Sequence, residues 1–379
     1  MATRTVTELE QVGPVRFAKV DAIRVSVPMH EPFRISSGEV TSKDAILLRV
    51  TDGEYFGWGE SSAMAGAFYS FDTPDSCQQQ LIRLLPGLIG NSFATMAELE
   101  AYLLGQALSP FVRVAVENAA WEMLARARGM SLRELFGLTE EDAPTGLAVG
   151  LYVTLEELKS ALERYNPLAY KRLKIKIKRG QDVELVQAVR QWYGDIALFV
   201  DANADYSEAD IPIFQELDRY GLMMFEQPFA KTDVATSAKL QTMVKTPICF
   251  DEGIETEQDV LRGAKLDAVR IVNIKLQRVG GFLEAFRIIE ACVACELPFW
   301  MGTMPELGIG SAQALVLTSH PACRFPTDVE PSSRWYVGDL LKPELNMKDA
   351  LLKIPHVPGL GFEVDEALVE RFATDRWSF

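Results

Sequence analysis

The feature that most constrains the fold is a repeat of short apolar runs that each end on a charged residue. The apolar residues are followed by Glu226 in "LMMFEQP", by Asp201 in "ALFVDAN" and by Asp251 in "PICFDEG". These three carboxylates lie 25 residues apart, and Lys176 and Lys275 extend the series at nearly the same interval. One strand, one loop and one helix take about 25 residues, so the interval predicts consecutive βα units.

The chain beyond about residue 146 alternates β-rich runs with helical ones. Eight runs are expected to form strands, in the order LAVGLYV, RLKIKI, IALFVDAN, LMMFEQP, PICFDE, AVRIVNIKL, LPFWMG and CRFPTD. Two of the intervening helices should begin with capping boxes, Ser207-x-x-Asp210 and Thr256-x-x-Asp259. This alternation predicts a parallel α/β fold, and eight strands favour a closed barrel. An open, doubly wound sheet is the alternative, but the chain lacks a GxGxxG fingerprint and a P-loop lysine.

The first third of the chain is organised differently. The runs "VDAIRVSVPM", "KDAILLRVTDG" and "YFGWGE" predict a three-stranded meander, and residues 73–138 have helical periodicity. We therefore predict an α+β domain over residues 15–140 and a barrel domain over residues 145–335. A C-terminal segment over residues 336–379 is expected to return to the first domain.

The charged ends of the strands are expected to lie at one height, at the mouth of the barrel where βα loops build active sites. In "RLKIKIK", Lys174 and Lys176 share one face, while the leucine and isoleucines share the other. The apolar face should pack on the helices, so both lysines should point into the barrel. Three converging carboxylates repel one another unless a cation lies between them. Because this set contains no histidine or cysteine, we expect Mg²⁺, with Mn²⁺ as a substitute.

A lysine beside a metal ion indicates proton chemistry. An ammonium group becomes an effective base only when desolvation or nearby positive charge lowers its pKa. The metal ion and Lys174 would supply that charge beside Lys176, and Lys275 should stand nearly opposite in the same barrel. A metal ion between two lysines suits removal of a proton α to a carboxylate.

The composition limits the partners. The 379 residues carry a net charge of −15, which argues against nucleic acid and anionic membranes, because both are bound by basic surfaces. The N-terminal residues lack the apolar core of a secretory signal, and no apolar run reaches 18 residues, so a cytoplasmic location is expected. We expect a homo-oligomer that acts on a small carboxylate substrate.

Taken together, the motifs resemble the enolase superfamily, in its muconate-lactonizing subgroup, and most closely the o-succinylbenzoate synthase/N-succinylamino acid racemase family. The resemblance covers nearly the whole chain, through AFYSFDT, GWGE, KIK, DANADY, FEQP, DE and NIKLQRVGG. It implies a modified (β/α)7β barrel with an N-terminal α+β capping domain, and Mg²⁺ ligands at Asp201, Glu226 and Asp251. It also implies that Lys176 is the base on one face of the substrate and that Lys275 is the acid/base or cation on the other.

The resemblance further implies a set of substrate-binding residues. Two would lie near the substrate carboxylate, three would come from the seventh strand, and two would belong to capping-domain loops that select the substrate. In that order, they are Lys174, Asn203, Gly302, Thr303, Met304, Phe68 and Tyr69.

The chain departs from the family pattern at its seventh and eighth strands. The family commonly has GGMxExGxGR, but Thr303 replaces the second glycine and Ser311 replaces the arginine. The family also commonly has Pro-Gly-Asp, but Thr327 stands between Pro326 and Asp328. These positions are expected to border the distal substrate pocket, so the resemblance specifies the proton chemistry more closely than the substrate.

Two reactions would use the same lysines and carboxylates. The favoured one is the syn-dehydration that forms o-succinylbenzoate, a carbon–oxygen lyase reaction of menaquinone biosynthesis, and the alternative is racemisation of N-succinyl- or N-acylamino acids. Dipeptide epimerisation, suggested only by the run Asp328-Val-Glu330, and muconate cycloisomerisation are less favoured. A catalytically silent binding barrel is the least favoured, because both lysines and all three carboxylates are present.

Overall fold

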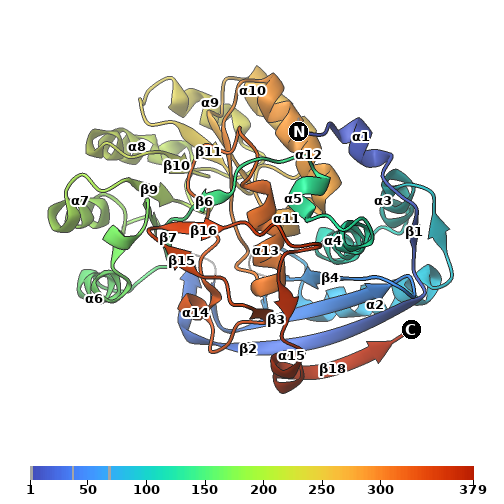
Figure 1. Ribbon diagram of the computed structural model, residues 1–379. Helices are drawn as coiled ribbons and strands as arrows, with labels where there is room; N and C mark the ends of the chain where they lie inside the picture. The colour runs from blue at the N-terminus through green and yellow to red at the C-terminus, as the bar shows by residue number, and fades with distance from the viewer. Residues whose placement is uncertain (1–2, 36–37, 67–69) are drawn as a thin grey trace.

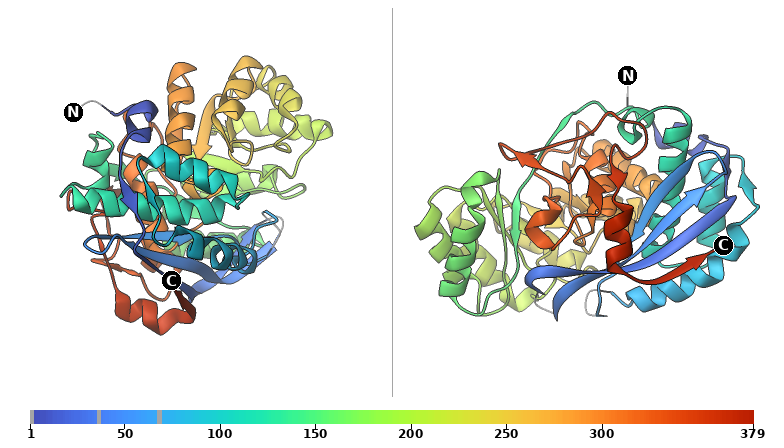
Figure 2. Two further views of the ribbon diagram at one scale, coloured as in Figure 1. Left: turned by 90° about the vertical axis from the view of Figure 1, so that its right-hand side faces the viewer. Right: turned by 60° about the horizontal axis from the view of Figure 1, so that its bottom comes forward.

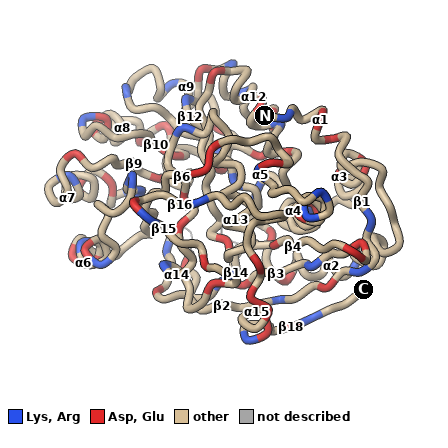
Figure 3. The backbone as a smooth tube through the Cα atoms, in the orientation of Figure 1, with Lys and Arg blue, Asp and Glu red and all other residues tan. Residues whose placement is uncertain are grey.

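The computed structural model describes residues 3–35, 38–66 and 70–379 and has two units, a capping domain and a curled α/β sheet (Figure 1). No helix within these described ranges is long and apolar enough to cross a membrane. Acidic and basic residues are interspersed along the outer helix α6 (Leu155–Tyr165), whereas α8 (Ile211–Leu217) carries one charged residue, Glu216 (Figure 3).

The capping domain contains the predicted three-stranded meander, extended by one strand. The strands β2 (Lys19–Ile35), β3 (Gly38–Thr51) and β4 (Phe56–Ser61) pair antiparallel in that order. The strand β18 (Ala373–Ser378), near the end of the chain, pairs antiparallel with β2 (Figure 2). The sheet therefore joins segments that are more than 300 residues apart in the sequence.

Four helices follow the meander, and one of them forms the boundary with the barrel. They are α2 (Pro74–Leu88), α3 (Met96–Gly105), α4 (Pro110–Ala127) and α5 (Leu132–Leu135). The helix α4 is buried along most of its length because it contacts both the meander and helices of the barrel domain. Gly57 and Gly59 of the "GWGE" run allow β4 to approach it closely. A Cβ atom on Gly59 would lie 1.9 Å from the carbonyl oxygen of Ala115.

Seven parallel strands form the curled sheet, and neighbours in the sheet follow the order of the chain. They are β7 (Leu147–Val149), β8 (Leu173–Lys176), β9 (Leu198–Asp201), β10 (Phe225–Glu226), β11 (Ile248–Phe250), β12 (Ile271–Ile274) and β13 (Phe299–Met301). The other α-helices that connect them are α7 (Val183–Tyr193), α9 (Val234–Gln241), α10 (Glu257–Lys265), α11 (Leu276–Val279) and α12 (Phe282–Ala294), and α13 (Gly308–Leu317) follows β13. Short 3-10 turns lie at Pro167–Ala169, Glu208–Asp210 and Asp218–Tyr220. Both predicted capping boxes are present, before Glu208–Asp210 and before α10.

The prediction of an eighth strand at "CRFPTD" is wrong, because this segment does not form a regular strand, although it occupies the eighth position of the barrel. It makes only isolated bridges, from Cys323 to Phe299 and from Thr327 to Thr145. These bridges bring it to β13 at one edge of the sheet and to the residues before β7 at the other. Pro326 interrupts regular pairing because it has no N–H to donate. The barrel is therefore closed by an irregular segment.

The remaining elements link the two units. The segment after the barrel contains α14 (Ser332–Trp335), β14 (Leu341–Lys342), β15 (Met347–Lys348), β16 (Leu351–Lys353), β17 (Glu363–Val364) and α15 (Glu366–Phe372). The strand β16 pairs with β15 and with β6 (Asp142–Pro144), and β14 pairs with β17. Near the N-terminus, α1 (Val6–Glu10) contacts α12, and β1 (Val15–Arg16) pairs with β5 (Ser92–Phe93).

Candidate active site

The interior of the barrel has an apolar layer below and a charged layer above. The apolar cluster contains Phe199, Met224, Cys249, Ile271 and Trp300, one from each of five neighbouring chain segments. The residues two positions further along four of these segments are Asp201, Glu226, Asp251 and Asn273. Successive side chains of a strand alternate between its faces, so each polar group lies on the same inward face as the apolar group below it.

The charged residues at the strand ends were predicted to lie at one height in the barrel. This prediction is right for Lys176, Asp201 and Glu226 and wrong for Asp251 and Lys275. Lys176 is in register with Asp201, and Asp201 is in register with Glu226. Glu226, however, is in register with Cys249, which places Asp251 two residues higher. The next pair, Phe250 with Val272, moves Lys275 higher again. Strands that close into a barrel must be staggered, and this shear accounts for the difference.

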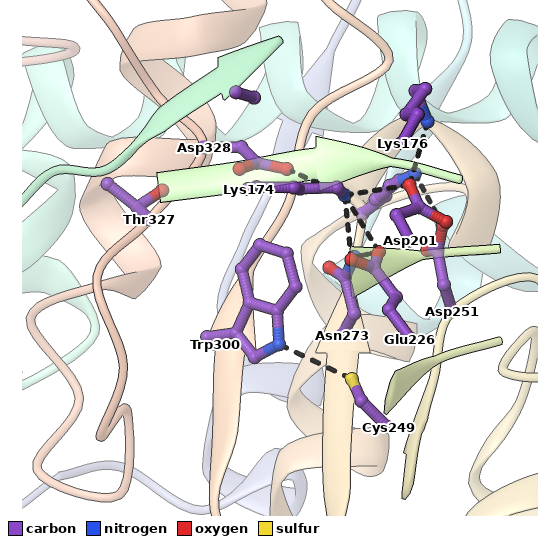
Figure 4. A network of polar contacts seen from close by, with 12 residues as sticks. Lys174, Lys176, Asp201, Glu226, Cys249, Asp251, Asn273, Trp300, Thr327 and Asp328 are labelled. Carbon is purple, nitrogen blue, oxygen red and sulfur yellow. Dashed lines mark hydrogen bonds and ion pairs between the residues drawn. The ribbon is translucent and has the colours of Figure 1, made fainter. Parts of the chain in front are cut away.

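Lys174 is at the centre of the charged layer (Figure 4). Its Nζ atom lies 2.8 Å from Oε2 of Glu226, 3.1 Å from Oδ2 of Asp201 and 3.3 Å from Oδ2 of Asp328. Burial lowers the pKa of Lys174, but the surrounding carboxylates outweigh burial and hold the pKa well above its ordinary value. The ammonium group therefore stays charged and is shared between two of the predicted metal ligands and Asp328.

Lys176 lies at one side of this cluster. Its Nζ atom donates hydrogen bonds to Oδ2 of Asp201 at 2.7 Å and to Oδ1 of Asn203 at 2.6 Å. The Nδ2 atom of Asn203 donates in turn to Glu252 at 3.0 Å. Asn203 has a φ of +43°, a left-handed conformation that asparagine tolerates better than most residues. Its backbone thus places the amide where it orients the Lys176 amine.

Lys275 lies at the other side of the cluster. Its Nζ atom is 2.7 Å from Oδ2 of Asp251, and the Arg278 guanidinium pairs with the second oxygen of the same carboxylate. Burial raises the pKa of Asp251, but these two cations outweigh burial and bring the pKa to about 2. Since β8 and β12 are four positions apart in the sheet order, Lys176 and Lys275 approach from opposite sides of an eight-position barrel.

The three predicted metal ligands have the right donor chemistry for Mg²⁺ but are held apart by lysines. No three carboxylate, histidine or cysteine side chains in the described part of the chain are close enough to hold a metal ion as they stand. Glu226 is fully buried, and among the described residues its Oε2 atom has no aligned hydrogen-bond donor, although Lys174 is near. Burial and the neighbouring Asp201 carboxylate raise the pKa of Glu226 to about 8. A buried carboxylate oxygen whose near partner is a lysine ammonium is the kind of donor that also suits a hard cation.

A pocket with a volume of about 560 Å³, including its opening, lies above these groups. Its floor is polar and its walls are mostly apolar, and both domains line it, through Phe33, Met64, Ala148, Val149, Lys174, Lys176, Asn203, Lys275, Thr303, Met304, Pro305, Asp328 and Trp335. Both predicted catalytic lysines, Lys176 and Lys275, therefore meet at one pocket with four of the predicted substrate-binding residues, Lys174, Asn203, Thr303 and Met304. Phe68 and Tyr69 lie outside the described residues.

Three other sequence-predicted positions are not among the residues that line this pocket. A Cβ atom on Gly302 would lie 2.3 Å from Oδ1 of Asn273, so this glycine makes room for a polar side chain of the charged layer. Ser311 lines a smaller cavity behind Thr303. Thr327 donates a hydrogen bond to the carbonyl of Met301 at 2.7 Å and joins the eighth segment to β13. Ser311 and Thr327 thus do not line the main pocket, and their expected place beside the distal part of the substrate stays a prediction.

Two further residues, which were not predicted from the sequence, hold the charged layer together. Asn273 donates from Nδ2 to Oε1 of Glu226 at 2.9 Å. Arg172 is buried beneath Lys174 and forms an ion pair with Asp328. Residues two positions apart in a strand point to the same face of the sheet. Asn273 precedes Lys275 by two residues and Arg172 precedes Lys174 by two, so this spacing could have predicted that both point into the barrel.

Comparison with known proteins agrees with this arrangement. Residues 18–137 match the N-terminal domain of the mandelate racemase/muconate lactonizing enzyme family, and residues 154–368 match the enolase C-terminal domain-like family. An o-succinylbenzoate synthase of Geobacillus kaustophilus is 36% identical over 92% of this chain and 93% of its own. An N-succinylamino acid racemase of Amycolatopsis is 36% identical over 95% of this chain and 98% of its own.

A solved structure extends the likeness to three dimensions. A protein of Listeria innocua, described as a member of the enolase superfamily, superposes with a TM-score of 0.90 at 31% identity, over 96% of this chain and 99% of its own. The chain therefore belongs to the enolase superfamily, within the family of o-succinylbenzoate synthases and N-succinylamino acid racemases.

Proposed function

We propose that the protein is an Mg²⁺-dependent enzyme that removes the proton α to a carboxylate and that it forms o-succinylbenzoate by dehydration. The observation that carries the proposal is the placement of Lys176 and Lys275, which line one pocket from opposite sides of the barrel. The similarity to o-succinylbenzoate synthases over nearly the full length of both chains supports this choice of reaction.

Asp201, Glu226 and Asp251 would hold the metal ion. When bound, Mg²⁺ supplies positive charge that stabilises the negative charge developing on the substrate carboxylate. Lys174 lines the pocket beside these ligands and would bind a carboxylate oxygen of the substrate. The apolar walls around Met304 exclude water from the reacting carbon and favour a substrate with an apolar body.

Lys176 would carry the proton through both steps of the dehydration. Its neutral amine takes the α-proton, and the electron pair of the broken C–H bond moves onto the substrate carboxylate. This pair then returns to form the new carbon–carbon double bond as the C–O bond breaks, and the departing hydroxyl takes the proton back from Lys176 and leaves as water. One lysine suffices because a syn elimination uses one face of the substrate. Asn203 orients the amine, and Lys275 remains a fixed positive charge on the other face.

Racemisation of N-succinylamino acids is the second candidate, because it needs a proton-transferring group on each face and Lys275 is in place to be one. Dipeptide epimerisation is less well supported. Asp328 is paired with Arg172 and Lys174, and Glu330 accepts from the backbone of Ala148 and lies 3.1 Å from Arg334. These two carboxylates are thus already engaged and poorly placed to bind the ammonium group of a dipeptide.

The test compares both reactions in the same Mg²⁺-loaded protein. The wild type should convert the cyclohexadiene precursor of o-succinylbenzoate at roughly 1–1000 per second. In D₂O, a dedicated dehydratase should show little α-proton exchange with N-succinylamino acids. In a racemase, Lys176→Arg and Lys275→Arg should each stop exchange from one enantiomer and spare the other. Lys178→Arg is the matched control, because Lys178 follows β8 and does not line the pocket.

Each result has a definite meaning. Conversion of the precursor with loss on Lys176→Arg supports the dehydratase. Enantiomer-specific loss of exchange supports the racemase. If neither substrate reacts in the wild type, or if Lys176→Ala leaves the observed activity unchanged, the proposed function is wrong.

A further inference from the structure

Lys174 contacts two of the three predicted metal ligands. Its ammonium nitrogen is within 3.1 Å of both Asp201 and Glu226, the two predicted metal ligands on neighbouring strands β9 and β10. Only 5% of the side chain is exposed, so water contributes little to balancing these charges. The carboxylates of Asp201 and Glu226 cannot contact the Lys174 ammonium group and surround a divalent cation at the same time. The two cations would therefore compete for these carboxylates.

The structure also provides a second partner for the same ammonium group. Oδ2 of Asp328 lies 3.3 Å from Nζ of Lys174, on the side away from Asp201 and Glu226 (Figure 4). Asp328 is fixed by its ion pair with Arg172, whose guanidinium in turn stacks over the rings of Phe199 and Trp300. A small movement of the flexible lysine side chain is therefore enough to leave the predicted metal ligands without losing its charge partner.

We propose that Lys174 is an internal counter-ion that competes with the metal ion for Asp201 and Glu226, and that Asp328 holds its ammonium group once the metal ion is bound. The inference rests on the proposed metal site and concerns how this chain controls that site. In the metal-free protein, Lys174 keeps the buried carboxylates paired. Metal binding frees its ammonium group to face the pocket, so the substrate carboxylate should bind after the metal ion.

Metal affinity, measured without turnover, tests the competition. The full-length protein is treated with chelator and titrated with Mn²⁺, and the free ion is followed by electron paramagnetic resonance. Lys174→Met removes the competing charge and should tighten Mn²⁺ binding by about tenfold or more, which is about 1.4 kcal/mol. Lys178→Met removes a lysine from the segment after the same strand, outside the cluster, and should change the affinity less than twofold. Lys174→Gln replaces the methionine variant if that variant does not fold, as judged by circular dichroism.

The proposed role of Asp328 predicts an effect of the opposite sign. Asp328→Asn weakens the second partner, so Lys174 should stay with the carboxylates and Mn²⁺ should bind several-fold more weakly. In the Lys174→Met background, the same substitution should have little further effect, because the group through which it acts is gone. Additive effects of the two substitutions would contradict the proposed role of Asp328.

The outcomes separate this inference from the proposed function. If the wild type binds Mn²⁺ and the affinity of Lys174→Met is unchanged or weaker, Lys174 does not compete with the metal ion and the inference is wrong. If neither the wild type nor any variant binds Mn²⁺, the metal site itself is wrong and the inference falls with it.

Discussion

Glu60 should stabilise the contact between the two domains by capping a helix of the barrel from a strand of the capping domain. The helix α13 begins after Leu307, whose side chain cannot accept a hydrogen bond from the free N–H groups of the first turn. Glu60, at 0% exposure on β4, supplies the missing acceptors. Its Oε1 atom accepts from the backbone N–H of Leu307 at 2.7 Å, and its Oε2 atom accepts from that of Gly310 at 2.8 Å.

The size of the effect follows from these two bonds. A hydrogen bond to a charged group contributes about 1.5–3 kcal/mol, and a buried donor left unsatisfied costs about 1–3 kcal/mol. Relief of the cost of burying the Glu60 carboxylate, which raises its pKa, offsets part of the loss. We therefore expect Glu60→Ala to lower the free energy of unfolding by about 3–5 kcal/mol. Glu60→Gln keeps one acceptor oxygen and should lower it by about 1–3 kcal/mol.

Urea unfolding followed by circular dichroism measures both changes. Glu54→Gln, an exposed position on the same hairpin, is the control and should stay within about 0.5 kcal/mol of the wild type. A loss of less than about 1 kcal/mol for Glu60→Ala, or a larger loss for Glu60→Gln than for Glu60→Ala, would refute the capping argument.

Three further predictions concern the barrel. Glu226→Gln should abolish Mg²⁺ binding and turnover with an unchanged circular dichroism spectrum, because an amide is a weaker Mg²⁺ ligand, and full activity of chelator-treated wild type without added metal would contradict this. Burial lowers the pKa of His320 to about 4, so below its unfolded pKa of 6.5 the unfolded chain binds more protons. The contribution of the neutral His320 to the free energy of unfolding should thus be complete above pH 6.5, and the free energy should fall by up to about 3 kcal/mol towards pH 4. Denaturation at a series of pH values measures this loss, and His320→Asn should remove it. Gly302→Ala should reduce turnover by displacing Asn273, whereas Gly105→Ala, with open space around it, should not.

The constant interval and the strand parity predicted much of the barrel and its site. The interval follows from the length of a βα unit, and parity correctly turned Lys174 and Lys176 inwards. Neither property contains the hydrogen-bond register, because register depends on how far each strand slides past its neighbour when the barrel closes. Asp251 and Lys275 consequently stand higher than the interval alone suggested.

Other features depend on contacts between segments far apart in the sequence. Pro326 in "CRFPTD" is a local signal against a regular eighth strand, because proline has no N–H group to donate within a sheet. The need for a glycine at position 302 follows from the side chain of Asn273, which comes from the preceding strand and fills the space where a Cβ atom would lie. The partner of β2 at the C-terminus likewise has no local signal, because "ATDRWS" is short and largely polar.

In the proposed function, the charges at the mouth of the barrel would connect binding of the metal ion to binding of the substrate. The described residues bring five acids and five bases into one network: Asp201, Glu226, Asp251, Glu252 and Asp328, with Arg172, Lys174, Lys176, Lys275 and Arg278. The set is balanced when every group is ionised, and it carries one negative charge with the neutral Lys176 amine that the proposed reaction needs. A divalent ion would leave either form with a net positive charge, which is costly in a buried site. A substrate carboxylate, with the further negative charge that develops on it as the α-proton leaves, restores the balance. The network would therefore oppose the proposed metal ion alone but favour the metal ion together with an anionic substrate, and the Lys174 ammonium would pair with carboxylates of the protein in the first state and with the substrate in the second.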